Sequence, residues 1–147
     1  MLAAAETLVS ATVGESGRPF DELLGIVREA ASGRTYQRAL GAVARELGAL
    51  VRESFAGESS SAGVAWKPLR RPRTGRILER TGRLRKAATR VLFAGQRLVI
   101  DLPPYGTFHQ DGTGRMPARP FLPDVDRDAG VRLRLERAMQ EVLDGPR

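Results

Sequence analysis

The chain has 147 residues, of which 41% are hydrophobic and 28% charged, a composition typical of one folded domain. It has no cysteine and one histidine, so disulfides, thiolate chemistry and the common Cys/His zinc sites are excluded within a single chain. Its net charge is +7, it has no apolar run of the roughly 18 residues needed to cross a bilayer, and its first residues make a poor secretion signal.

Three stretches of the sequence predict helices. After Pro19, apolar residues recur at three- and four-residue intervals over 20–31. A stronger apolar stripe covers 40–55, and a third helix is expected over 129–143, where Gly145 and the following proline end it. We expect an N-terminal helical arm over 1–35 and a single domain over 36–147.

A loop and a basic segment follow the second predicted helix. Residues 56–63 are small, polar and flanked by glycine, so this stretch predicts a flexible loop. Residues 67–90 then hold ten basic side chains and one acidic side chain, a local charge of +9 against −2 for the rest of the chain. Pro68 and Pro72 make a long helix there unfavourable. We expect residues 56–74 to become ordered only on assembly.

The next part of the chain predicts β structure. Two β-rich runs within 89–102 are joined by a short connection with a glycine, which is typical of a hairpin, and Pro103 ends the second strand. Residues 116–123 contain three prolines and must be extended. The predicted fold class is α+β: a small antiparallel β-sheet packed against N-terminal helices and one C-terminal helix, with long loops. The stripe that ends at Phe55 is expected to pack on that sheet.

No group of residues predicts catalysis or metal binding. His109 and Asp111 lack an activated nucleophile in any recognisable motif, so a structural histidine in a turn is the better interpretation. Asp124, Asp126 and Asp128 alternate, but the glycine and glutamate that an EF-hand requires are missing, and the first turn of a helix explains these acids better. We expect no enzyme activity, no cofactor and no metal.

The basic segment over 67–90 allows two interpretations. It could bind nucleic acid through phosphate contacts, with Trp66 as the only large aromatic side chain nearby. It could instead pair with acidic patches of another subunit. Composition alone leaves both alternatives open.

Four short elements in a fixed order carry a resemblance. They are Trp66-Lys67-Pro68-Leu69, the run Ile77 to Leu84 with its Thr-Gly pair, the run Tyr105 to Gly112 with a His-Gln pair, and Met116-Pro117-Ala118-Arg119-Pro120-Phe121-Leu122. In this order they resemble the phage virion morphogenesis family, which includes the Mu-like G protein, tail completion proteins and, more distantly, head-tail joining proteins of long-tailed phages. The resemblance covers roughly residues 40–143.

This resemblance implies a structural protein of the virion that forms a ring, with six copies expected, at the junction of head and tail. Its implied partners are head connector or stopper proteins and tail tube or terminator proteins, with DNA passing through the channel and assembly in the host cytoplasm. The alternatives are a tail terminator in the strict sense and a small nucleic-acid-binding accessory protein that uses residues 67–90.

The candidate site residues are those expected to face the lumen or a neighbouring subunit. Arg119 could make a bidentate contact with a carboxylate or with carbonyls of its own fold, and Phe121 could serve docking or fill the core. The full set is Trp66, Arg70, Arg71, Arg73, Arg76, Arg80, Arg83, Arg85, Tyr105, His109, Gln110, Arg119 and Phe121.

Overall fold

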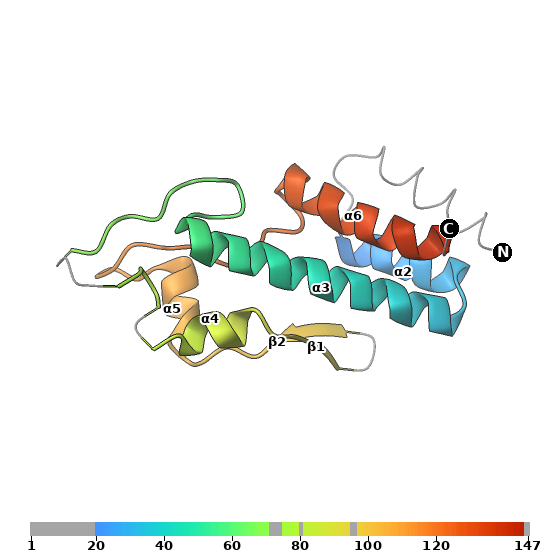
Figure 1. Ribbon diagram of the computed structural model, residues 1–147, viewed down its shortest axis with the longest axis horizontal. Coiled ribbons are helices and arrows are strands. Elements are labelled where there is room, and N and C mark those ends of the chain that lie inside the picture. Colours follow the sequence, from blue (N-terminus) through green and yellow to red (C-terminus); the bar gives the residue numbers. More distant parts are fainter. Residues whose placement is uncertain (1–19, 71–74, 80, 95–96, 146–147) are drawn as a thin grey trace. The chain divides into compact units, whose positions relative to one another are not determined.

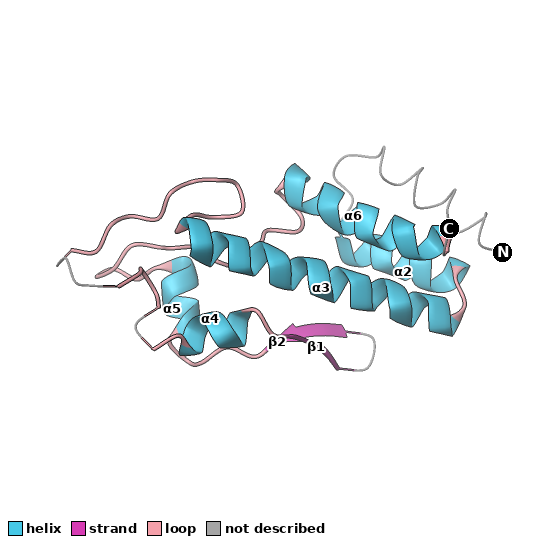
Figure 2. Cartoon of the chain, in the orientation of Figure 1, coloured by secondary structure: helices cyan, strands magenta, loops and turns pink. Residues whose placement is uncertain are grey.

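The computed structural model describes residues 20–70, 75–79, 81–94 and 97–145. Its elements in chain order are α2 (Phe20–Ala30), α3 (Gly33–Gly57), α4 (Arg83–Ala88), β1 (Val91–Ala94), β2 (Arg97–Ile100), α5 (Gly106–Asp111) and α6 (Ala129–Asp144) (Figures 1 and 2). The chain forms two compact units, with one boundary within α3 and the other between Pro123 and Asp124. We call Met1–Glu46 with Asp124–Arg147 the helical unit, and Leu47–Pro123 the loop unit.

The predicted α+β class is wrong. The described residues form five helices, and their strands are two four-residue segments, β1 and β2, that pair only with each other. They run antiparallel with Val91 opposite Ile100 and Ala94 opposite Arg97, at the place where the sequence predicted a hairpin. A two-stranded ribbon cannot form one face of a core in the way a larger sheet does. The protein is therefore mainly helical.

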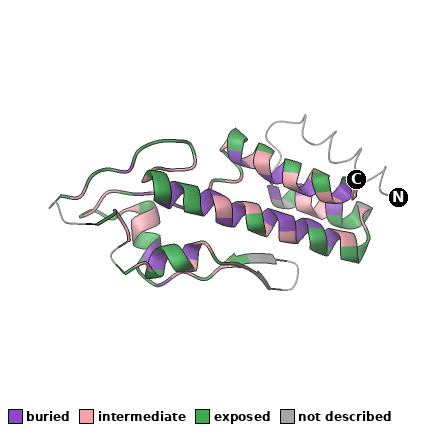
Figure 3. Ribbon diagram, viewed as in Figure 1, coloured by how far each residue is buried: buried purple, intermediate pink, exposed green. Residues whose placement is uncertain are grey.

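The three predicted helices are present as α2, α3 and α6, and their apolar periods form the core of the helical unit. Side chains along one face of each helix are buried, as Figure 3 shows by colour, and the most deeply buried of them are at most 2% exposed. These fully buried side chains are Leu23, Val27, Leu40, Val43, Val131, Leu135, Met139 and Leu143. Residues 1–19 of the predicted N-terminal arm lie outside the described residues, and α2 is the part of it that the structure describes.

Polar groups in the helical unit are closely paired. The Arg134 guanidinium on α6 lies 2.7 Å from the Glu46 carboxylate on α3. Glu136 is only 4% exposed, and Arg132 neutralises it across one turn of α6 at 3.0 Å. Burial raises the pKa of Tyr36 above its ordinary value, although the nearby Arg28 opposes that shift. Buried charge in this unit has a partner of opposite sign.

The sequence predicted the acidic run in the first turn of the following helix, and only Asp128 lies at the start of that helix. Asp128 is the N-cap of α6 and accepts hydrogen bonds from the backbone N–H groups of Gly130 and Val131. Asp126 accepts the backbone N–H of Phe20, the first residue of α2, at 2.9 Å. No group of three or more acidic or histidine side chains suited to a metal ion occurs in the part of the chain that the structure describes.

The core of the loop unit is built around Phe55 at the end of α3. Its ring lies 5.5 Å from the rings of both Trp66 and Phe121, and the contact with Trp66 is edge-on. Val51 of α3 and Leu84 and Ala88 of α4 complete the buried cluster. Among its described side chains the hairpin does not take the role predicted for it, since Val91 and Ile100 are only partly buried and Val99 is 39% exposed. Single buried aromatic residues on loops replace the predicted sheet.

Candidate functional site

The first and fourth sequence elements are joined by hydrogen bonds from side chain to backbone. The Trp66 indole N–H donates to the Pro120 carbonyl at 2.7 Å. In return, Arg119 donates from Nε to the Lys67 carbonyl at 2.8 Å and from Nη2 to the Pro68 carbonyl at 3.0 Å. These bonds connect positions more than 50 residues apart in the chain. They fix two proline-containing segments that cannot satisfy their own backbone groups in a helix or sheet.

The third and fourth elements are joined in the same way. The Gln110 side-chain oxygen on α5 accepts the backbone N–H groups of Phe121 and Leu122 at 2.9 and 3.0 Å. Gly112 ends α5 with a φ of 76°, and a Cβ placed there would lie 2.6 Å from the Ala118 nitrogen. Glycine is therefore needed at this position both for its conformation and for the close approach of the two backbones.

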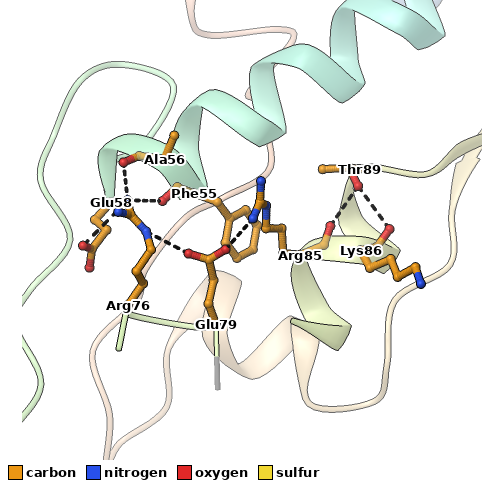
Figure 4. Close-up of polar contacts among 8 residues, drawn as sticks. All are labelled: Phe55, Ala56, Glu58, Arg76, Glu79, Arg85, Lys86 and Thr89. Carbon is orange, nitrogen blue, oxygen red and sulfur yellow. Dashed lines mark hydrogen bonds and ion pairs between the residues drawn. The ribbon is translucent and has the colours of Figure 1, made fainter. Parts of the chain in front are cut away.

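The second element is held by an ion-pair network (Figure 4). The Glu79 carboxylate lies 2.9 Å from Arg76 Nε and 2.9 Å from Arg85 Nη1. Arg76 also donates from Nη2 to the carbonyls of Phe55 and Ala56 in the last turn of α3. Carbonyls in a last helical turn have no partner within the helix, so Arg76 acts as a side-chain cap.

A groove of about 880 Å³ opens in the loop unit, and all four elements contribute to it. The described residues that line it are Leu69, Leu78, Thr81, Arg83, Leu84, Tyr105, His109 and Arg119. The first element supplies Leu69, the second supplies four residues, the third supplies Tyr105 and His109, and the fourth supplies Arg119. The hydrogen bonds between the elements thus also shape this groove.

The groove is positively charged. Its described lining includes Arg83 and Arg119 and no carboxylate. The pKa of His109 is lowered, first by burial and then by the neighbouring Arg119 guanidinium, so the imidazole is neutral at pH 7. His109 Nδ1 is shielded from solvent and has no hydrogen-bond partner among the described residues. The Tyr105 ring stands edge-on to the imidazole, with ring centroids 6.0 Å apart.

The remaining predicted site residues fall into three groups: buried in the core, at the surface, and outside the described residues. Trp66 and Phe121 are 5% and 0% exposed, so their side chains fill the core instead of facing a lumen. Arg70 is exposed, as is Tyr105 at its groove edge, whereas Arg76 and Arg85 are bound to Glu79. Three further predicted residues lie outside the described residues: Arg71, Arg73 and Arg80.

The sequence interpretation missed the groove leucines and the role of Glu79. Leu69, Leu78 and Leu84 belong to the elements that carried the resemblance, but nothing in their spacing indicated a shared surface. Glu79 is the one acidic residue in the basic segment. A lone acid among ten cations was the available signal for an internal ion-pair centre.

The predicted loop contains backbone hydrogen bonds. Ser60 and Val64 are paired through the backbone, and Trp66 N–H donates to the Glu58 carbonyl at 2.8 Å. Residues 71–74 of the stretch expected to order on assembly lie outside the described residues.

No protein family, curated protein or solved structure matches the chain. None of the described helices is both long enough and apolar enough to span a membrane.

Proposed function

We propose that this protein is a structural component of a phage neck or tail end, which assembles as a ring and completes the tail for joining to the head. The proposal starts from the four sequence elements that resemble the virion morphogenesis family. Six copies is the first stoichiometry to test, and head connector or stopper proteins and tail tube or terminator proteins are the proposed partners. DNA would pass through the ring channel, and assembly would take place in the host cytoplasm.

The observation that carries the proposal is the mutual dependence of the first, third and fourth elements. A polar side chain of each one bonds to the backbone of another: Trp66 to Pro120, Arg119 to Lys67, and Gln110 to Phe121. Short motifs that occur together by chance would not be expected to complete one another's backbone hydrogen bonds. The resemblance therefore concerns one folded unit and its binding surface.

The nucleic-acid alternative depends on free cations in residues 67–90. Arg76 and Arg85 are held by Glu79, and Arg76 also caps α3, so these two side chains are less available for phosphates. Exposed cations of the described residues remain at Lys67, Arg70, Arg83, Lys86 and Arg90. This distribution supports a surface with selected free charges more than an unpaired basic stripe.

Native mass spectrometry of the purified protein, alone and mixed with purified tails that lack it, tests the proposal. We expect a closed oligomer of defined copy number that binds one end of the tail and allows heads to join. Submicromolar binding of duplex DNA by the isolated subunit in physiological salt, without ring formation and without tail binding, would contradict it.

A further inference from the structure

The groove contains a buried cation without a counter-ion. Arg119 is 7% exposed, and its two hydrogen bonds go to the neutral carbonyls of Lys67 and Pro68. Among the described residues, no carboxylate lies within ion-pair distance of its guanidinium. Carbonyl partners satisfy the N–H groups but do not neutralise the charge, and an uncompensated buried charge is unfavourable. In the helical unit, by contrast, the buried charge of Glu136 is neutralised by an ion pair with Arg132.

Two further groups in the groove lack partners. The Arg83 side chain makes no hydrogen bond or ion pair with any described residue, and it lies on the groove wall. His109 Nδ1 is shielded from solvent, and no described residue is its hydrogen-bond partner. The groove therefore offers an anion two guanidinium groups, one of them already held in place by the backbone. A fixed guanidinium loses little side-chain entropy when it binds a carboxylate.

The groove walls favour a protein segment over a nucleic acid. Leu69, Leu78 and Leu84 supply apolar surface next to the two arginines. A polynucleotide presents its phosphates on a hydrophilic backbone, which gains nothing from leucine walls. A peptide can place one carboxylate on Arg119 and an adjacent apolar side chain on the leucines.

We propose that this groove binds an acidic, leucine-rich segment of a neighbouring virion protein, with its carboxylate between Arg119 and Arg83 and its apolar side chains on Leu69, Leu78 and Leu84. The inference rests on the proposed function, because it names the contact through which a neck component would hold its neighbour. In this scheme Arg119 has two roles. Its hydrogen bonds hold the first and fourth elements together, and the same bonds orient the guanidinium toward the partner.

Fluorescence anisotropy with short synthetic peptides tests the inference on the isolated protein. One labelled peptide alternates leucine with glutamate, and its control carries glutamine in place of each glutamate. We expect the glutamate peptide to bind at least about tenfold more tightly. Equal affinity for the two peptides, or no binding of the glutamate peptide up to about 1 mM, would overturn the inference.

Two matched pairs of variants locate the binding site. Arg83→Glu and Lys86→Glu make the same charge change at exposed positions of α4, but only residue 83 lines the groove. We expect Arg83→Glu to weaken peptide binding at least about tenfold and Lys86→Glu less than about threefold. Leu69→Ser and the exposed Val64→Ser form the corresponding apolar pair.

The outcomes separate the inference from the function on which it rests. Equal losses in Arg83→Glu and Lys86→Glu would mean non-specific charge attraction and would overturn the groove assignment. Displacement of the peptide by duplex DNA, with the same sensitivity to Arg83→Glu, would assign the groove to nucleic acid and also overturn it. Ring formation and tail binding, measured by mass on the same preparations, would show independently whether the proposed function fails as well.

Discussion

The helical unit and the loop unit are stabilised by different interactions. In the helical unit, three helices bury apolar stripes, and side-chain hydrogen bonds mainly finish helix ends, as Asp128 does. In the loop unit, extended segments are held by side chains that bond to a distant backbone, as Trp66, Gln110 and Arg119 do. Loops leave their backbone groups unpaired, so a unit built from them must supply partners from side chains. Polar side chains can therefore stabilise a fold as well as bind a partner.

The largest expected effect tests whether the loop unit also needs an apolar core. Phe121→Ala removes a fully buried ring, and we expect it to lower the free energy of unfolding by about 3–5 kcal/mol. Phe108→Ala, at a site 54% exposed in the same unit, should change it by less than about 0.5 kcal/mol. Equal denaturant midpoints for the two variants would show that polar bonds alone hold the unit together.

A pair of glycines compares the two units directly. Gly112 and Gly145 end α5 and α6 with nearly the same backbone angles, φ 76° and 77°, ψ 173° and 177°. Alanine at Gly145 meets no atom within 4 Å, so we expect only the conformational cost of about 1–3 kcal/mol. Alanine at Gly112 would collide with the Ala118 backbone and should lose at least about 1 kcal/mol more, measured by denaturant unfolding. Similar losses would mean that the third and fourth elements separate without penalty.

Gln110 tests the side-chain-to-backbone bonds themselves. Gln110→Leu leaves the N–H groups of Phe121 and Leu122 without their acceptor, and we expect a loss of about 1–3 kcal/mol in unfolding free energy. Gln110→Glu keeps an oxygen at the same position and should retain most of the stability at pH 7. If both variants unfold at the same denaturant concentration, the two bonds contribute little.

The smallest expected effect is a pH dependence. The pKa of His109 is lowered in the folded protein, so as pH falls through the ordinary value of 6.5 the unfolded state takes up a proton first. The free energy of unfolding should therefore decrease as the pH is lowered from about 7.5 to about 5.5. The variant His109→Gln should lack the part of this decrease that is due to the imidazole. This is the only histidine in the chain, which makes the comparison simple. If the unfolding free energy of the variant depends on pH as strongly as that of the original protein, the lowered pKa of His109 is contradicted.

The sequence predicted the helical unit well because its structure depends on periodicity. The apolar intervals of α2, α3 and α6 are long enough to show a helical repeat. Helices α4 and α5 have six residues each, less than two turns, so no repeat could reveal them. The α+β prediction failed for a related reason: β-rich runs indicate that strands form, but not how many strands will pair.

The groove could be predicted only in part. Resemblance put His109 and Arg119 among the candidate residues, but the backbone bond between them and the bond from Arg119 to Lys67 depend on where proline-containing loops cross in space. Charge counting marked Arg76 and Arg85 as free cations, although Glu79 binds both. Sequence patterns indicate local conformational preference. They do not indicate which distant residues will meet, or which arginines will bind a shared carboxylate.

The backbone conformation of Leu78 limits which residues can replace it during evolution. Its backbone has a φ of 63°, which suits glycine or asparagine and costs leucine about 1–2 kcal/mol, yet its side chain packs on the core cluster and lines the groove. A library randomised at this position and selected for folding alone should lean toward residues that relax the backbone. Selection for partner binding should return leucine or another large apolar residue. The two selective pressures act on one codon in opposite directions, so the residue that prevails there records which of them has dominated.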